Sequence, residues 1–275
     1  MRLLCWNCRG LGSSSTVRHG ERLTQTLKPD FVFLSETHSK EKKAIQILSN
    51  WDFEQSLEVP RSGLSGGLVL GWSDNFQIQV IFQSKNLIHV DTYDEKEDQC
   101  FITLLYGNPT LTKRNEVWQK LEQLGKDING RWMCIGDFNQ VLDFEDKLTF
   151  EDTGIQGSQE LRSCLSNLSL LPIESKGLSY TRKNKRPGSE FVIEKLDKAF
   201  ANWERCNAYP HCLVQNLPIM CLDHGPILLD TTWRPPFGQR PFRFEWMWTS
   251  HPDCFSIIQE AWNTNYQGSR AFELV

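Results

Sequence analysis

Polar side chains that could bind a cation or transfer a proton follow several apolar stretches of the chain. They form five short constellations, at residues 6–10, 34–38, 106–109, 136–139 and 223–227. Each constellation alone predicts an ordinary structural feature, because Asp, Asn and Ser favour turns and helix caps. Their recurrence favours a functional site, because strand ends commonly converge on one rim where sites are built.

The residue types match the requirements of phosphoester hydrolysis. A hard divalent cation prefers carboxylate oxygen, which Glu36 offers, with Asn7 and Asp223 expected nearby. Such a cation polarises the phosphate and stabilises the leaving oxygen. The sequence therefore predicts a site for a hard cation at these three residues.

Other residues of the constellations suit the proton transfers of the same reaction. A water molecule must be oriented and deprotonated, a task for Asp137 or His224. Asn139 can donate a hydrogen bond to charge developing on phosphorus. Asp197 can fix the tautomer of His224 and favour its charged form. The structural alternatives stay open at this point: Asp197 alone suits a helix N-cap, and Tyr106 alone suits an edge core residue.

The elements that must position these residues alternate irregularly between strands and helices. Short apolar runs predict strands over residues 3–6, 31–34, 68–70, 76–80, 87–90, 101–106, 132–135, 179–182, 191–196 and 213–217. Helical spacing predicts helices over residues 16–27, 40–48, 112–128, 161–171 and, as a short one, 197–204. This mixture favours two β-sheets packed face to face with helices outside.

The composition is that of an ordinary globular chain. It has 275 residues, of which 39% are hydrophobic and 23% charged, enough to build a sizeable core. No apolar window is long enough to cross a membrane, and no signal peptide is visible. Nine cysteines without a compact disulfide framework indicate a reducing compartment. We expect an intracellular protein, nuclear or cytoplasmic and not secreted, with no membrane partner.

The charge is acidic overall but locally basic. A net charge of −4 argues against a strongly basic nucleic-acid coat, although a local cluster can still supply an attractive field. One such cluster comprises Arg182, Lys183, Lys185 and Arg186. From the residues alone, a solvated loop and a DNA-binding loop are equally good interpretations of it.

Taken together, the constellations resemble the endonuclease/exonuclease/phosphatase superfamily, which includes DNase I and the apurinic endonucleases. The motifs that carry the resemblance are Asn7 in WNCRG, Glu36 in LSETH, Tyr106 in LYGNP, Asp137 and Asn139 in GDFN, Asp197 in KLD, and Asp223-His224 in DHGPI. Their order and spacing match across about residues 1–230. The resemblance implies a DNase I-like fold, a four-layered α/β sandwich of two packed β-sheets flanked by helices.

A closer resemblance is to the endonuclease domains of LINE-type non-LTR retrotransposons, particularly those of plants. It rests on WNCRG, SETH, the SYTR of residues 179–182 and the EKLDKA of residues 194–199. The motifs RPFRFE and WMW, at residues 240–248, look like the start of a linker to a reverse transcriptase. The resemblance thus implies a nuclease domain over residues 1–230, a linker-like tail over residues 231–275, and a longer parent protein with a reverse transcriptase domain.

By position, the resemblance implies three groups of functional residues. The catalytic group comprises His224, Asp137, Asn139, Asp197 and Tyr106. The metal group comprises Glu36, which would hold Mg²⁺ (or Mn²⁺), with Asn7 and Asp223 close to it. The DNA-binding group comprises Thr181, Arg182 and Lys183. Within the first group, Asp137 would orient the attacking water, Asn139 and Tyr106 would contact the scissile phosphate, and Asp197 would pair with His224.

Two positions depart from the pattern of the superfamily. Arg9 stands two residues after Asn7, where the DNA-repair members have Asp, as expected of the retrotransposon branch. Leu222 stands before Asp223, where that branch usually has Ser. A hydroxyl contact near the phosphate is therefore lost, and from the sequence we expect Leu222→Ser to raise the reaction rate. The alternative is that Leu222 packs under the loop and that Ser would only loosen it.

The function predicted from the sequence is a metal-dependent phosphodiesterase, a monomer that nicks DNA and is of retrotransposon origin. Two alternatives remain: a catalytically decayed relic that only binds nucleic acid, and a phosphatase of the same superfamily. A Mg²⁺-dependent plasmid-nicking assay separates the three.

Overall fold

A computed structural model describes most of the chain. The described residues are 1–40, 42–61, 63, 66–150, 154–184, 186, 188–220, 222–234 and 249–263. The chain divides into two compact units, Met1–Trp233 and Arg234–Val275. In the second unit the structure describes one helix, α6 (Cys254–Asn263). The tail motifs of residues 240–248, and Lys185 of the basic cluster, lie outside the described residues.

A seven-stranded sheet forms one half of the core of the first unit. Its strands, in spatial order, are β11 (Ser175–Gly177), β15 (Leu213–Asn216), β16 (Ile227–Asp230), β1 (Arg2–Asn7), β2 (Phe31–Ser35), β4 (Leu68–Trp72) and β3 (Gln55–Val59). Every residue of β2 is buried. Its continuous apolar run is typical of a strand covered on both faces.

A six-stranded sheet forms the other half, and a three-stranded sheet lies beside them. The six strands, in spatial order, are β10 (Leu171–Pro172), β14 (Asp197–Ala201), β8 (Arg131–Asp137), β7 (Gln99–Tyr106), β6 (Leu87–Tyr93) and β5 (Ile78–Gln83). The three-stranded sheet has the order β12 (Arg182–Lys183), β13 (Val192–Glu194) and β9 (Lys147–Thr149). This small sheet carries part of the basic cluster.

The helices of the first unit begin and end where the local sequence favours it. They are α1 (Ser14–Leu27), α2 (Lys43–Asn50), α3 (Leu111–Gly125), α4 (Ser158–Asn167) and α5 (Trp203–Ala208), with 3₁₀ turns at Phe144–Asp146 and Gly188–Glu190. The Ser13 side chain accepts a hydrogen bond from the backbone of Ser15 and caps α1. Asn202 caps α5 in the same way.

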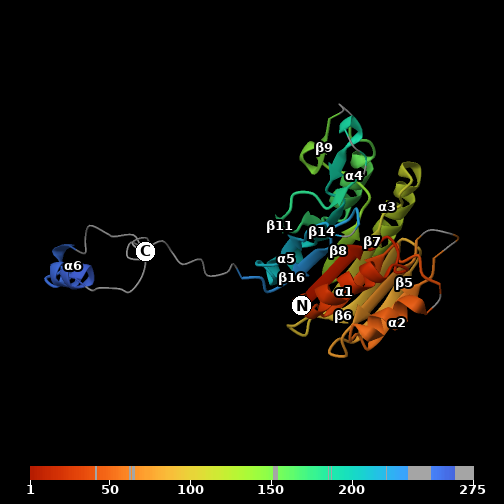
Figure 1. Ribbon diagram of the computed structural model, residues 1–275. Helices are drawn as coiled ribbons and strands as arrows, with labels where there is room; N and C mark the ends of the chain where they lie inside the picture. The colour runs from red at the N-terminus through yellow and green to blue at the C-terminus, as the bar shows by residue number, and fades with distance from the viewer. Residues whose placement is uncertain are drawn as a thin grey trace. The chain divides into compact units, whose positions relative to one another are not determined.

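The first unit has four layers, with helices outside two packed sheets (Figure 1). One face of the seven-stranded sheet, including Leu4 and Leu34, packs against α1 and α2. Its other face, including Leu3, meets the six-stranded sheet in the central core. The far face of that second sheet, including Trp132 and Phe200, packs against α3 and α4. Because successive strand residues point to opposite faces, each apolar run serves two of these interfaces. The predicted four-layered α/β sandwich is confirmed.

Strand direction brings the polar residues to one edge of the two large sheets. β1 and β2 run parallel, so Asn7 and the residue that follows β2 end at the same edge. β7 and β8 also run parallel, with Tyr106 opposite Asp137. β14 is antiparallel to β8, and its first residue, Asp197, pairs with Asp137. β16 is antiparallel to β1 and begins just after His224.

One predicted helix is wrong in a way that matters for the site. Residues 197–204 were expected to form a short helix, but Asp197–Ala201 is strand β14, buried between β10 and β8. The helix begins only at Trp203. Pairing with β8 and burial of all five strand residues override the helical preference of the two alanines. Asp197 is therefore a strand residue and not a helix N-cap.

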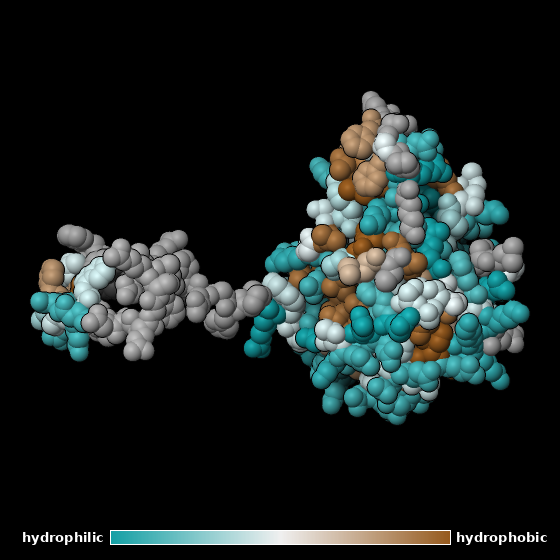
Figure 2. All heavy atoms as spheres, viewed as in Figure 1, coloured by the Kyte–Doolittle hydropathy of each residue, from teal (hydrophilic) through white to brown (hydrophobic). Residues whose placement is uncertain are grey.

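The visible surface of the first unit is mostly hydrophilic (Figure 2), and the described cysteines form no disulfide bonds. Figure 2 shows hydrophilic residues over most of the visible face of the first unit, and a hydrophobic group near the end where Figure 1 labels β9. The exposed apolar side chains of that segment are Phe144, Leu148 and Phe150. The eight cysteines within the described residues are all unpaired. None of the described helices has the length and apolar character needed to span a membrane.

Candidate active site

Glu36 is the centre of a hydrogen-bond network that joins the two sheets. It follows β2 and is 7% exposed. Its Oε1 accepts a hydrogen bond from Asn7 Nδ2 at 3.0 Å and from the Tyr106 hydroxyl at 2.7 Å. Burial and the neighbouring Glu36 charge raise the pKa of Tyr106 far above its ordinary value, so its hydroxyl remains a donor. The second carboxylate oxygen of Glu36 is left for other partners.

Asp137, at the end of β8, is held through both of its oxygens. Oδ2 accepts a hydrogen bond from Asn7 Nδ2 at 2.9 Å, and Oδ1 accepts one from the backbone N–H of Asn139 at 2.8 Å. Asn7 therefore connects Asp137 with Glu36, and its amide nitrogen, not its oxygen, faces both carboxylates. The oxygen of Asn7 accepts a hydrogen bond from the backbone of Arg9. In this arrangement Asn7 positions the two carboxylates.

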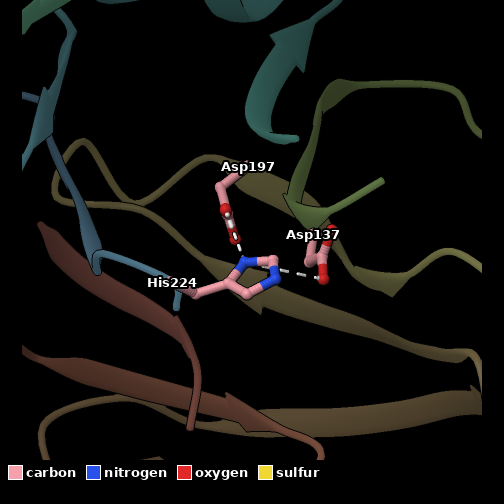
Figure 3. Close-up of side chains that lie close together, drawn as sticks. All are labelled: Asp137, Asp197 and His224. Carbon is pink, nitrogen blue, oxygen red and sulfur yellow. Dashed lines mark hydrogen bonds and ion pairs between the residues drawn. The ribbon is translucent and has the colours of Figure 1, made fainter. Parts of the chain in front are cut away.

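His224 lies between two buried carboxylates, and the three side chains form what we call the buried triad (Figure 3). His224 Nδ1 is 3.1 Å from Asp197 Oδ2 and 4.0 Å from Asp137 Oδ2. Each member of the triad is at most 2% exposed. Trp6 donates from its ring nitrogen to the backbone oxygen of His224 and so fixes the loop that carries the imidazole.

The charges of the triad decide where its proton resides. Burial lowers the pKa of His224, but the nearby charges of Asp137 and Asp197 outweigh burial and raise this pKa to about 9. Burial, followed by the charge of Asp197, raises the pKa of Asp137 above its ordinary value. His224 is thus a charged imidazolium near neutral pH, and Asp137 is a stronger base than an exposed carboxylate.

Several residues of the site have an uncommon backbone conformation. Arg9, Glu36, His38 and Asn139 all have positive φ angles, of 43°, 52°, 48° and 51°. Non-glycine residues in this left-handed region are uncommon and cluster at functional sites. Gly107 is required for a different reason, since a Cβ there would lie 2.0 Å from the Phe138 carbonyl oxygen. The chain approaches itself closely at the end of β7, which holds Asn139 and Tyr106 near each other.

An open cleft of about 810 Å³ gives access to this edge of the sheets. Glu36, Tyr106 and Asn139 line it, together with basic residues that include Arg9 and Arg182. The buried triad does not line the cleft and lies behind these residues. The Asn139 amide also donates to the carbonyl of Gly107 at 2.8 Å, which holds this side chain at the cleft wall.

Arg9 spans the two carboxylates predicted to bind the metal. Its Nε is 3.5 Å from Glu36 Oε2, and its Nη2 is 2.8 Å from Asp223 Oδ2. His38 Nε2 lies 3.7 Å from the same oxygen of Glu36. From the sequence, Arg9 was only a departure from the family pattern, and His38 had no predicted role. The one signal for the contact with Glu36 was that Arg9, two residues after Asn7, carries a charge opposite to that of the predicted metal ligand Glu36.

Two groups of residues could hold a cation, and their chemistry differs. The ligand atoms of the buried triad lie within 4.8 Å of one another, but its imidazolium already supplies positive charge to both carboxylates. Glu36 and Asp223 instead present carboxylate oxygens to an ion pair with Arg9 beside the cleft. Hard cations prefer oxygen ligands, so the donor set of Glu36 and Asp223 fits a divalent cation better than the triad does.

The predicted DNA-binding residues occupy different depths. Thr181 is 1% exposed, and its hydroxyl accepts hydrogen bonds from the backbone N–H groups of Leu196 and Asp197, both at 3.0 Å. Its side chain therefore positions Asp197, and a contact of its own with DNA stays a prediction. Arg182 lines the cleft and pairs with Glu194 at 2.7 Å. Lys183 is half-buried, and its backbone N–H donates to the carbonyl of Asp223.

Leu222 has a structural environment that the sequence could not show. Its side chain is half-buried and packs against the apolar cluster that contains Trp6 and Leu217. It is not among the residues that line the cleft. The position thus supports the packing of the loop before His224 and offers no evidence for a lost phosphate contact.

With this geometry established, comparison with known proteins assigns the family. Residues 4–253 match the model of the Endonuclease/Exonuclease/phosphatase family. The chain belongs to this family. The membership places it among hydrolases of phosphoester bonds and confirms the resemblance at the level of the superfamily. The likeness to plant LINE elements stays a prediction. A comparison with curated proteins found no match to the sequence.

Several solved structures share the fold at low sequence identity. The 3′ phosphatase NExo from Neisseria, solved with a product DNA hairpin, has a TM-score of 0.61 and 14% identity, covering 85% of this chain and 100% of that chain. The endonuclease domain of TRAS1, a telomere-specific non-LTR retrotransposon, has a TM-score of 0.60 and 13% identity, covering 85% and 99%. The AP endonuclease LMAP from Leishmania major has a TM-score of 0.63 and 14% identity, covering 83% and 86%. At these identities the likeness shows the fold alone.

Proposed function

We propose that this family member is a metal-dependent endonuclease that nicks DNA and derives from a LINE-type retrotransposon. The observation that carries the proposal is the adjacency of the buried triad to the Glu36 network behind an open, arginine-lined cleft. The similarity of the fold to both the TRAS1 endonuclease domain and a DNA-bound phosphatase supports DNA as the substrate. In this proposal the protein acts as an intracellular monomer, and a longer parent protein carries a reverse transcriptase.

The residues of the triad divide the proton chemistry between them. His224 carries its proton near neutral pH, because its pKa is raised to about 9, and is therefore unsuited to deprotonate water. Asp137, with its raised pKa and both oxygens oriented by Asn7 and Asn139, is the better base. The imidazolium of His224, oriented by Asp197, stabilises negative charge that develops on the phosphate.

The metal, Mg²⁺ or Mn²⁺, belongs with Glu36 and Asp223 in this proposal. When bound, it would polarise the phosphate and stabilise the leaving oxygen. Tyr106 and Asn7 orient the Glu36 carboxylate toward this task through their hydrogen bonds to Oε1. In this proposal Tyr106 and Asn139 would contact the scissile phosphate and Arg182 the DNA backbone, which is supported by the position of all three in the lining of the cleft.

Conversion of supercoiled plasmid to the nicked form tests the proposal. We expect the parent protein to nick plasmid with Mg²⁺ and to lose this activity with EDTA. His224→Ala should lower the rate by about 10²–10⁴-fold, the usual effect of removing a positioned proton-transfer group. A variant that nicks as fast as the parent refutes the role of His224. DNA binding without cleavage by the parent indicates the non-catalytic relic, and release of phosphate from inositol lipids or nucleotides without nicking indicates a phosphatase.

A further inference from the structure

The arrangement of Arg9 between two carboxylates has a consequence for metal binding. The Nε and Nη2 atoms of Arg9 belong to one edge of the guanidinium, and this edge faces Glu36 Oε2 and Asp223 Oδ2. These are the oxygens that the metal proposal requires. A cation from the chain itself therefore offsets part of the charge of the two carboxylates.

We propose that Arg9 is an internal counter-ion that competes with the divalent metal for Glu36 and Asp223, and that metal entry requires its side chain to move away. The inference rests on the proposed metal site. Mg²⁺ approaches its oxygen ligands at about 2.0–2.1 Å, so the metal and the guanidinium cannot occupy the space between the two carboxylates together. Their like charges also repel each other.

The surroundings of Arg9 allow this movement. Its side chain is 38% exposed, whereas those of Glu36 and Asp223 are 10% and 17% exposed. Arg9 also lines the 810 Å³ cleft, so the guanidinium can enter solvent without displacing packed side chains. The carboxylate of Glu36 is restrained on its other oxygen by Tyr106 and Asn7. Arg9 is thus the most exposed member of the two ion pairs, and the Glu36 carboxylate is held in place by partners other than Arg9.

A metal titration with matched variants tests the inference without any measurement of nicking. Mn²⁺ binding to the purified full chain is followed by the electron paramagnetic resonance signal of the free ion and by calorimetry. Arg9→Met keeps much of the side-chain length but removes the charge, and we expect it to tighten Mn²⁺ binding by about tenfold or more. Arg9→Lys keeps the charge and should bind like the parent or between the two.

Arg182→Met is the matched control, because Arg182 lines the same cleft but pairs with Glu194. Its loss should change Mn²⁺ affinity by less than about threefold, the size expected of a screened charge without direct contact. An equal gain in both methionine variants would show that only the general field of the cleft matters and would overturn the inference. Circular dichroism confirms folding, and Arg9→Ala serves as a second variant if Arg9→Met does not fold.

Glu36→Gln separates failure of this inference from failure of the proposed metal site. If Glu36→Gln abolishes Mn²⁺ binding while Arg9→Met binds no more tightly than the parent, the metal site stands and Arg9 is not a competitor. If the parent and Arg9→Met both fail to bind Mn²⁺, or if binding survives Glu36→Gln unchanged, both ideas are overturned. Tighter binding by Arg9→Met alone, with binding lost in Glu36→Gln, supports both.

Discussion

The protonation of His224 decides which member of the buried triad can act as the base, and it also predicts how stability depends on pH. The pKa of His224 is raised from 6.5 to about 9. Because the pKa of His224 is higher in the folded than in the unfolded state, protonation of His224 stabilises the fold. This contribution is complete below pH 6.5 and is lost as the pH rises through about 9. At 1.36 kcal/mol per pKa unit, the contribution is about 3 kcal/mol.

Urea unfolding of the metal-free protein measures this contribution. We expect the free energy of unfolding to fall between about pH 6 and about pH 10, and to fall by about 3 kcal/mol less in His224→Gln, which cannot be protonated. His211→Gln is the matched control, because His211 is exposed on the surface. It should keep the pH dependence of the parent.

A nuclear magnetic resonance titration of the His224 ring in EDTA gives the pKa directly. A value near 9 agrees with the two carboxylates outweighing burial. A value at or below 6.5 would mean that burial dominates, and it would refute the reasoning that leaves Asp137 as the base. In that case a neutral imidazole could itself accept the proton of the water.

The remaining predictions concern the metal ligand and the residue before the Asp-His motif. Glu36→Gln should lower nicking and weaken its dependence on Mg²⁺ together, because a neutral amide is a poorer ligand for a hard cation; unchanged rates across a Mg²⁺ titration would remove Glu36 from the site. Leu222→Ser should lower the melting temperature by about 2–4 °C and leave the nicking rate unchanged, since it removes about 1 kcal/mol of packing against the Trp6 cluster. A rise in rate in a stable Leu222→Ser variant would restore the sequence-based expectation of a missing phosphate contact.

The sequence predicted the layers well because side-chain alternation records which faces are buried. In β1 the residues Leu3 and Cys5 belong to the central core, while Leu4 and Trp6 belong to the outer one. A strand with two buried faces must be apolar throughout, and such runs are visible without a structure. The site could be predicted for the same reason, since its polar residues stand where these runs stop.

The errors arose where tertiary contacts decide the outcome. The segment that begins at Asp197 has alanines and a following turn, and only its pairing with β8 makes it a strand. The resemblance implied a DNA contact for Thr181, which stays a prediction, but it could not show that the Thr181 hydroxyl also holds the backbone of Asp197. The contact of Arg9 with Asp223 joins residues far apart in the sequence, and no local pattern encodes it.

The pairing of charges in the cleft reconciles an acidic chain with a proposed DNA substrate. The net charge is −4, and three of the arginines that line the cleft pair with carboxylates. Arg182 pairs with Glu194, and Arg186 pairs with Glu190. Arg9 is held in the same way by Asp223, so part of the positive charge of the cleft is offset, although among the described residues Arg114 donates only to Gln140 and to backbone carbonyls. If a divalent ion takes the place of Arg9, the site gains the two charges of the metal, and the guanidinium is released toward the cleft. Metal binding would then create much of the attraction for the phosphate backbone, and the proposed competition links substrate binding to the presence of the metal.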